Sequence, residues 1–177
     1  MNYEELGKAI YEVSLLRGSF QLRSGITSSE YFDKYQFESR PWLLKEITLH
    51  LIELLPKEFD ILAGLETGGI PLATAISLEL SKPVVFVRKK AKEYGTMKLA
   101  EGVDVYGKTL VVIEDVVTSG GQVASSVEDL RKLGARCNTA LCVIDREQGG
   151  KENLKQSGIE LISLYTYSQL KTLVEKS

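Results

Sequence analysis

The sequence predicts an α/β domain in which a mainly parallel central sheet is covered by helices on both faces. Short apolar segments rich in Val, Ile and Leu alternate with segments of helical periodicity, and this alternation is typical of parallel sheets buried on both sides. The chain has 177 residues, of which 44% are hydrophobic, which is enough to bury one substantial core. We therefore expect a single domain over residues 1–177, with no repeat or linker dividing it.

The first half of the chain is expected to begin with a helix and to continue with short strands, a second helix, a further strand and a third helix. Apolar residues at positions 6, 9, 10, 13 and 16 have amphipathic spacing and predict a helix over 3–17. Short strands broken by "RSGITSSE" are expected over 19–37. Pro41 suits a first helical turn and begins a helix to about residue 55. The apolar run "FDILAGL" predicts a strand, and 69–80 a helix.

The second half repeats the alternation of strand and helix. Helices are expected over 121–133, closed by Gly134, and over about 149–157. Cys137 and Cys142 lie five residues apart in one expected strand, so we expect them on opposite faces as buried, reduced thiols. The expected strands are "KPVVFVRK", "KTLVVIEDV", "RCNTALCVID" and "IELISLYTY".

Bulk charge excludes several classes of partner. The 22 Lys and Arg residues nearly balance the 24 Asp and Glu residues, for a net charge of −2, which favours neither nucleic acid nor an anionic membrane as a partner. The N-terminal residues lack the basic and apolar regions of a secretion signal, and no stretch approaches the roughly 20 apolar residues of a membrane span. We expect a cytoplasmic protein.

The stretch "VVIEDVVTSGGQ", residues 111–122, carries the chemistry. It places two acids, Glu114 and Asp115, at the end of a buried strand, and a run of small residues at 118–121 before a helix. Backbone N–H groups at such a helix start form a cradle for a phosphate. The acids would repel that phosphate, so we expect them to accept hydrogen bonds from sugar hydroxyls beside it. The alternative is a capped helix preceded by solvated acids.

This stretch resembles the phosphoribosyl-diphosphate motif of type I phosphoribosyltransferases. The segments "RSGITSSEYFD", "VRKKAKEYGT" and "IDREQGG" narrow the resemblance to the orotate phosphoribosyltransferase family, over about residues 18–150. The resemblance implies a type I phosphoribosyltransferase fold whose small hood comprises about 1–38 and part of the C-terminal segment. It also implies Mg²⁺-dependent transfer of ribose 5-phosphate from phosphoribosyl diphosphate to orotate in pyrimidine synthesis, by a homodimer with shared active sites.

The resemblance further implies roles for individual residues. Lys92, Glu114 and Asp115 correspond to catalytic positions. Orotate-binding positions are Arg23, Tyr31, Thr118 and Arg146. Mg²⁺ is expected to be held mainly through the substrate, with no dedicated protein ligand. Positions expected to contact phosphoribosyl diphosphate are Arg88, Lys89, Lys92, Tyr94, Glu114, Asp115, Val116, Val117, Thr118, Ser119, Gly120, Gly121 and Gln122.

Local chemistry supports these roles and leaves alternatives open. The mobile loop expected over 88–102 holds five cations, which would stabilise charge developing on a diphosphate leaving group. The alternative is a basic loop that is merely solvated. Arg146 suits a planar carboxylate such as that of orotate; the alternative is a surface pair with Glu147 or Asp145. Gly68 and Gly69 either approach an anion or form a tight packing turn. A phosphoribosyltransferase for another base and a non-catalytic ligand sensor remain alternative functions.

Overall fold

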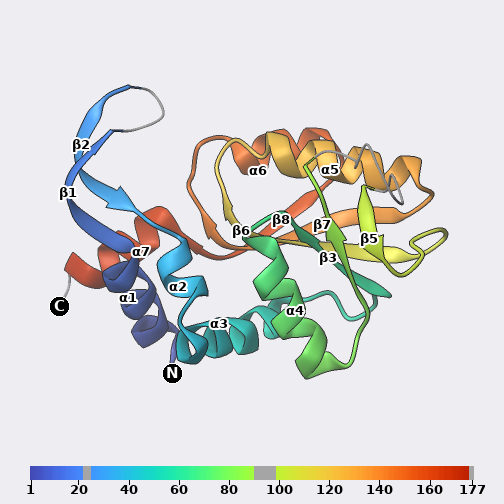
Figure 1. Ribbon diagram of the computed structural model, residues 1–177, viewed down its shortest axis with the longest axis horizontal. Coiled ribbons are helices and arrows are strands. Elements are labelled where there is room, and N and C mark those ends of the chain that lie inside the picture. Colours follow the sequence, from blue (N-terminus) through green and yellow to red (C-terminus); the bar gives the residue numbers. More distant parts are fainter. Residues whose placement is uncertain (22–24, 90–98, 176–177) are drawn as a thin grey trace.

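A six-stranded sheet forms the centre of the computed structural model, which describes residues 1–21, 25–89 and 99–175 (Figure 1). The strand order is β5-β4-β3-β6-β7-β8. Every neighbouring pair is parallel except β4 and β5, which are antiparallel. The mainly parallel sheet is therefore confirmed. Its strands are β3 Ile61–Leu65, β4 Val84–Val87, β5 Ala100–Gly102, β6 Thr109–Val117, β7 Arg136–Asp145 and β8 Glu160–Thr166.

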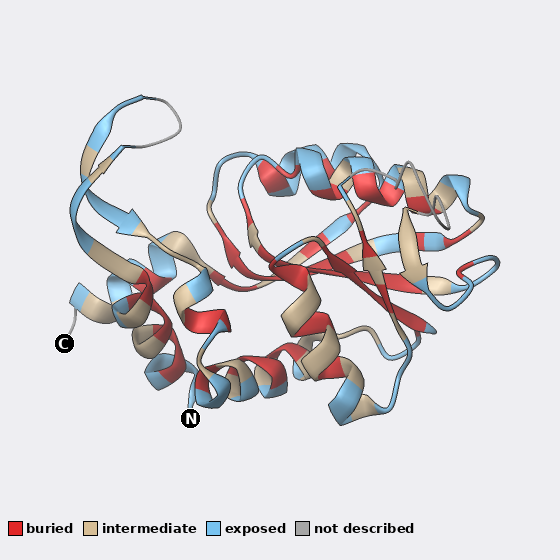
Figure 2. Ribbon diagram, viewed as in Figure 1, coloured by how far each residue is buried: buried red, intermediate tan, exposed pale blue. Residues whose placement is uncertain are grey.

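Helices cover both faces of this sheet, as predicted (Figures 1 and 2). On one face α3 (Pro41–Leu54) and α4 (Gly69–Leu80) pack against side chains of β6 that include Ile113. On the other face α5 (Gly121–Lys132) and α6 (Gly150–Gln156) pack against the alternate residues of the same strand, such as Val112. The expected helix over 69–80 has the predicted bounds, because Gly69 begins the helix directly after the buried strand β3.

The N- and C-terminal segments lie together at one end of the sheet (Figure 1). The helix α1 (Tyr3–Ser14) packs beside α7 (Tyr167–Glu175), and the hydroxyl of Tyr165 donates to the carbonyl of Tyr3 at 2.7 Å. A two-stranded antiparallel hairpin projects from the same end. Its strands are β1 (Leu15–Gln21) and β2 (Thr27–Phe32), and the short helix α2 (Tyr35–Glu38) follows them.

Three expectations about local structure were wrong. The first helix ends at Ser14 rather than residue 17, because Leu15 turns to an extended backbone and pairs with Phe32 of β2. Residues 35–38 form a helical turn, not a strand. Within the expected loop over 88–102, residues 100–102 form the edge strand β5; residues 90–98 lie outside the described part of the chain. The helix α7 was not anticipated.

The two cysteines share one face of the sheet, contrary to the prediction. Cys137 and Cys142 are both buried, free and part of the core beneath α5 and α6. A bulge explains this result: Leu110 pairs with Cys137, but Val111 pairs with Thr139, so the residue between them shifts the alternation by one.

The strand order reverses direction beside β3. The chain passes from β3 to β4 on one side and returns to β6 on the other, so the crevice at the carboxyl ends of β3 and β6 is a topological switch point, where ligands bind in open α/β sheets. Within the described residues, no helix combines the length and apolar character needed to span a bilayer.

Candidate active site

The loop from β6 to α5 lies at this switch point. Thr118 and Ser119 are exposed, and Gly120 takes a left-handed backbone, with φ of 77°, just before α5 begins at Gly121. A side chain at Gly120 would meet Leu154 of α6 at 2.9 Å. The first N–H groups of a helix have no partner within the helix, so the start of α5 offers donors and a partial positive charge to an anion.

The neighbouring helix α6 packs against this loop. A Cβ at Gly150 would lie 2.5 Å from the carbonyl oxygen of Thr118, so the absence of a side chain lets α6 approach the loop. The Nδ2 group of Asn153 donates to the carbonyl of Ser119 at 2.9 Å. These contacts hold the small-residue run 118–121 in place before α5. We call this run the phosphate cradle, after the ligand expected there.

The two acids before the cradle are buried rather than solvated. Glu114 is 8% exposed and Asp115 is 0% exposed. The N–H of Asp115 donates to Oε1 of Glu114 at 3.0 Å, and the N–H of Val116 donates to Oδ1 of Asp115 at 2.5 Å. The alternative of freely solvated strand-end acids is therefore wrong. Burial, and then the charge of Asp115, raise the pKa of Glu114 well above its usual range.

Two residues that the sequence analysis did not consider surround Asp115. Lys34, which precedes α2, places Nζ 2.5 Å from Oδ2 of Asp115. Glu38, at the end of α2, is 8% exposed, and burial followed by the nearby Asp115 raises its pKa to about 9. Burial alone would raise the pKa of Asp115, but contacts with Glu38, Glu114 and Lys34 outweigh it, and the pKa is lowered. Asp115 is thus the ionised acid of the cluster.

The turn between β3 and α4 closes over this carboxylate. A Cβ at Gly68 would lie 1.6 Å from Oδ2 of Asp115 and 2.9 Å from Oε1 of Glu38, and one at Gly69 would lie 2.1 Å from the carbonyl oxygen of Ile113. Both glycines are therefore required by packing against β6. The expected approach of this turn to an anion stays a prediction.

Arg88 and Lys89 lie at the carboxyl end of β4. The guanidinium Nε of Arg88 is 3.5 Å from Oε1 of Glu101, and the backbone N–H of Lys89 donates to Oε2 of Glu66 at 3.1 Å. Arg88 also lines a cavity of about 340 Å³ together with Thr67 of the β3–α4 turn. The other predicted residues of this region, Lys92 and Tyr94, lie outside the described residues, as does Arg23 of the hairpin.

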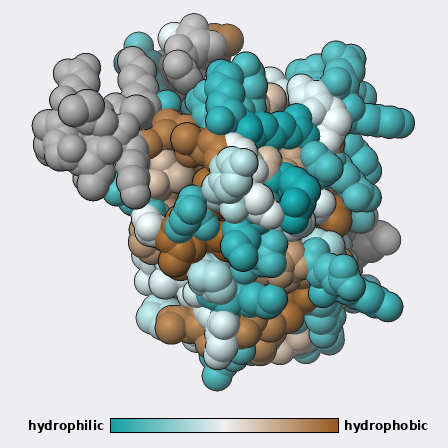
Figure 3. Space-filling view, turned by 90° about the vertical axis from the view of Figure 1, so that its right-hand side faces the viewer, coloured by the Kyte–Doolittle hydropathy of each residue, from teal (hydrophilic) through white to brown (hydrophobic). Residues whose placement is uncertain are grey.

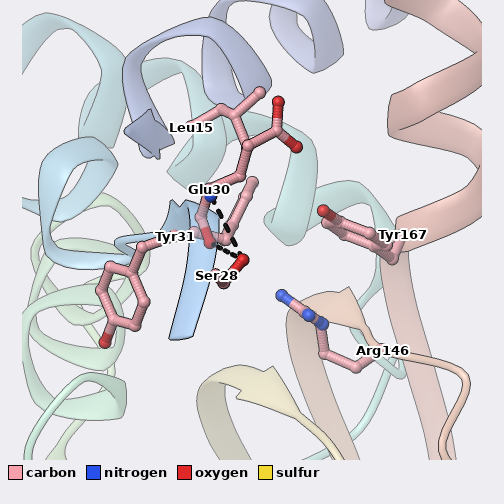
Figure 4. A pocket seen from close by; sticks show the side chains of 7 residues that line it. Leu15, Ser28, Glu30, Tyr31, Arg146 and Tyr167 are labelled. Atoms are coloured by element: carbon pink, nitrogen blue, oxygen red, sulfur yellow. Dashed lines mark hydrogen bonds between the residues drawn. The ribbon is translucent and has the colours of Figure 1, made fainter. Parts of the chain in front are cut away.

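Arg146 lies in a second cavity, of about 310 Å³, between the hairpin and the start of α7 (Figure 4). Its guanidinium stacks 4.2 Å from the ring centre of Tyr167 and 5.7 Å from that of Phe32. The side chains of Ser28, Glu30 and Tyr31 line the hairpin side. Tyr31 is 45% exposed, so it is not the core aromatic that was the alternative.

The acidic neighbours of Arg146 in the chain are engaged elsewhere. Oδ1 of Asp145 accepts the N–H of Glu147 at 2.9 Å, and Oε2 of Glu147 accepts both the N–H and the hydroxyl of Ser168. Within the described part of the chain Arg146 forms no ion pair with either acid, so the alternative of a surface pair is wrong. The backbone N–H of Arg146 donates to the carbonyl of Val117 at 2.8 Å.

Four side chains of these sites were missed by the sequence analysis: Lys34, Glu38, Phe32 and Tyr167. Lys34 and Glu38 have the i, i+4 spacing that places two residues on one face of a helix, but the region had been assigned to strands. Phe32 and Tyr167 each lie within an expected strand. An aromatic residue there is ordinary core material by sequence alone.

A family model described as a phosphoribosyl transferase domain matches residues 41–162. The chain therefore belongs to the phosphoribosyltransferase family. An orotate phosphoribosyltransferase from Nocardioides sp. is 46% identical over 165 residues, which cover 93% of this chain and 92% of that protein. Within the family, the chain groups with the orotate phosphoribosyltransferases.

Solved structures show the same fold. The orotate phosphoribosyltransferase from Aeropyrum pernix superimposes with a TM-score of 0.85 at 33% identity, covering 97% of this chain and 99% of the other. The Mycobacterium tuberculosis orotate phosphoribosyltransferase in complex with 5-phospho-α-D-ribosyl 1-diphosphate has a TM-score of 0.81 at 26% identity, covering 96% and 98% of the two chains. The expected type I phosphoribosyltransferase fold is confirmed.

Proposed function

We propose that this protein transfers ribose 5-phosphate from phosphoribosyl diphosphate to orotate, giving orotidine 5′-phosphate and diphosphate in pyrimidine synthesis. One observation carries the proposal: the hydrogen bond from Arg146 N–H to Val117 C=O joins the cavity that holds the Arg146 guanidinium to the phosphate cradle. A carboxylated base and a ribose phosphate would thus be held side by side. The relatives named orotate phosphoribosyltransferase support the same assignment.

The substrate's charges match the site from one end to the other. The 5′-phosphate binds the cradle of Thr118 to Gly121, and the ribose hydroxyls donate to the carboxyl groups of Glu114 and Asp115. The guanidinium of Arg146 meets the carboxylate of orotate as a planar, two-pronged donor. Its ring stacking with Tyr167 leaves the N–H edges available to the base.

In the reaction, the bond from C1′ to the diphosphate oxygen breaks and the bond from C1′ to N1 of orotate forms, while N1 loses its proton. As the first bond loosens, positive charge develops on the ribose and negative charge on the diphosphate. The ionised Asp115 favours the first, and the cations Arg88, Lys89 and Lys92 favour the second. These interactions strengthen towards the transition state, so they accelerate the reaction.

Magnesium is part of this proposal. Mg²⁺ prefers oxygen ligands in octahedral geometry, and diphosphate and ribose hydroxyls supply them. In the described residues no group of three or more His, Cys, Asp or Glu is placed to hold a metal, so we assign the ion to the substrate. When bound, it would neutralise charge on the leaving diphosphate.

We further propose a cytoplasmic homodimer in which each active site is completed by the neighbouring subunit. Large apolar side chains are exposed, among them Trp42, Leu78 and Tyr106. Apolar patches lie between hydrophilic side chains on the face shown in Figure 3. Exposed apolar patches of this kind are commonly covered by a partner protein.

A panel of bases tests the function directly. With phosphoribosyl diphosphate and Mg²⁺, orotate should be consumed, while adenine, hypoxanthine and uracil should not. Arg146→Ala should raise the KM for orotate more than that for phosphoribosyl diphosphate, because only the base loses its ionic partner. Arg136→Ala, an exposed arginine on β7 bonded to Thr109, is the matched control. A purine as the best substrate would contradict the proposal, and no turnover with binding intact would favour a ligand sensor.

A further inference from the structure

The chemistry proposed above does not use Lys34 and Glu38, the two ionisable side chains of α2 and its preceding residue that lie beside Asp115. Lys34 and Glu38 lie four residues apart on α2 and its preceding residue, so both side chains lie on one face of this turn. That face meets the carboxyl end of β6, where Lys34 Nζ is 2.5 Å from Asp115 Oδ2. Oε1 of Glu38 and Oδ2 of Asp115 both lie within 3 Å of the point where a Cβ at Gly68 would be. The pair therefore connects the hood end of the molecule to the proposed ribose site.

The contacts of Asp115 leave it one orientation. Its Oδ1 is held by the N–H of Val116, and its Oδ2 lies under Gly68, where even a methyl group would clash. Lys34 approaches Oδ2 closely enough for an ion pair, yet Oδ2 makes no hydrogen bond of good angle within the described residues. Oδ2 therefore keeps acceptor capacity, which the protonated carboxyl of Glu38 beside it can use.

The buried cluster around Asp115 is electrically neutral when two of its three carboxyl groups are protonated. Three carboxyl groups, on Glu38, Glu114 and Asp115, face one ammonium group, on Lys34. The raised pKa of Glu38, about 9, and that of Glu114 keep both acids protonated near neutral pH. One carboxylate and one ammonium remain, and the buried cluster is neutral. A lone buried carboxylate would instead be strongly disfavoured.

We propose that Lys34 and Glu38 are positioning residues that hold Asp115 as a fixed, ionised acceptor for the ribose hydroxyls of phosphoribosyl diphosphate. Lys34 supplies the counterion, and the neutral carboxyl of Glu38 supplies a hydrogen-bond donor. An acceptor held in place before the ligand arrives needs no reorganisation when charge develops on the ribose. This inference rests on the proposed function, because it assigns the ribose to Asp115.

Two replacements of Glu38 separate positioning from simple packing. Glu38→Gln keeps a neutral donor of the same shape, so the KM for phosphoribosyl diphosphate should stay within about twofold of wild type. Glu38→Met keeps the volume but removes the donor, so this KM should rise about tenfold, the usual effect of losing one hydrogen bond to a charged group. The KM for orotate should not change in either variant. Equal behaviour of the Gln and Met variants would overturn the role of Glu38.

Lys34→Met removes the counterion and should raise the KM for phosphoribosyl diphosphate about tenfold or more. Lys45→Met, at an exposed position of α3, is the matched control. In the double variant Lys34→Met with Asp115→Asn, the two effects should not add, because Lys34 acts through Asp115. Additive losses would overturn the inference. If Lys34→Met fails to fold, the Glu38 pair still decides.

Calorimetric titration with phosphoribosyl diphosphate and Mg²⁺ keeps this test separate from the proposed function. Should the wild type fail to use orotate, the function fails, but weaker binding by Glu38→Met than by Glu38→Gln would still support the positioning role. Should the wild type be active while Lys34→Met and Glu38→Met match it in affinity and KM, the function stands and the positioning role is wrong.

Discussion

Glu38 shows how one buried acid makes the stability of this protein depend on pH. In the folded chain burial raises its pKa to about 9, against about 4.5 for an exposed glutamate. Between those values the folded state keeps a proton that the unfolded state releases. Its contribution to stability is therefore complete below the unfolded pKa and is lost as pH rises towards the folded pKa.

Glu38→Gln cannot titrate, so it should gain stability relative to wild type as pH rises. We expect the difference in free energy of unfolding to grow by on the order of 1 kcal/mol per pH unit between about pH 5 and pH 8. Urea unfolding followed by circular dichroism measures it. Glu53→Gln, an exposed position on α3, controls for the loss of one carboxyl group. A difference independent of pH would mean that Glu38 is charged in the folded protein.

The acids of β6 should matter for chemistry more than for folding. Glu114→Gln with Asp115→Asn keeps both shapes but replaces the ionised acceptor of Asp115 and the carboxyl of Glu114 by amides, so transition-state binding should fall by on the order of 3 kcal/mol or more. The measurement is kcat/KM for phosphoribosyl diphosphate. Glu128→Gln with Asp129→Asn, an adjacent acidic pair on α5 that binds Lys132 instead, is the matched control. Near-normal turnover of the first variant would refute the ribose assignment.

At the scale of elements, local patterns predicted those parts of the fold that local chemistry determines. The helix from Gly69 to Leu80 and the strands β6, β7 and β8 follow from buried apolar runs and from glycines at their ends. The bulge that places Cys137 and Cys142 on one face depends on pairing with Leu110, a partner distant in sequence. No single-strand pattern contains that information.

The site was predictable to the same degree. The phosphate cradle and Arg146 follow strands directly and lie at one sheet edge, so position along the chain was enough to bring them together. Lys34 and Glu38 come from α2, a turn too short to have a period of its own. Their placement under Gly68 depends on how the N-terminal segment packs on the sheet. Tertiary contact alone made them functional candidates.

The helix α6 supplies a prediction about the cradle it supports. Gly150→Ala would push a methyl group to 2.5 Å from the carbonyl of Thr118, so the loop must shift and phosphate affinity should fall about tenfold or more. Gly121→Ala has 3.8 Å of clearance and should not lower the melting temperature, because alanine favours helix. Inorganic phosphate titration and thermal unfolding measure the two effects. Unchanged phosphate affinity in Gly150→Ala would show that the cradle lies elsewhere.

At the scale of the whole molecule, shared sites make a prediction about mixtures. Lys92→Ala and Asp115→Ala homodimers should each be nearly inactive, because one lacks the proposed cation and the other the proposed ribose acceptor. A hybrid dimer holds one site with an intact core from the first variant and an intact loop from the second. With random reassortment, half of the dimers are hybrids, so an equimolar mixture should recover roughly a quarter of wild-type activity.

Loop closure within one subunit gives the opposite result. Each hybrid site would then carry one defect, and mixing would restore nothing. Native mass spectrometry confirms that hybrids have formed, and wild-type protein mixed with Lys92→Ala calibrates the exchange. No recovery in the presence of confirmed hybrids would rule out shared sites.

The cavity of Figure 4 is assembled from parts of the chain that carry little of the ribose-phosphate machinery. Ser28, Glu30 and Tyr31 come from a two-stranded hairpin that is not part of the main sheet, and Tyr167 opens the C-terminal helix. Substitutions on the hairpin leave the cradle and its supporting helix in place. If the cavity binds the base and the cradle binds the sugar donor, as proposed, this division separates the choice of nucleobase from the binding of the sugar donor. A library of substitutions at positions 28, 30 and 31 would test new acceptor bases, including carboxylated rings of other sizes. The main sheet and the proposed binding residues for the sugar donor would stay unchanged.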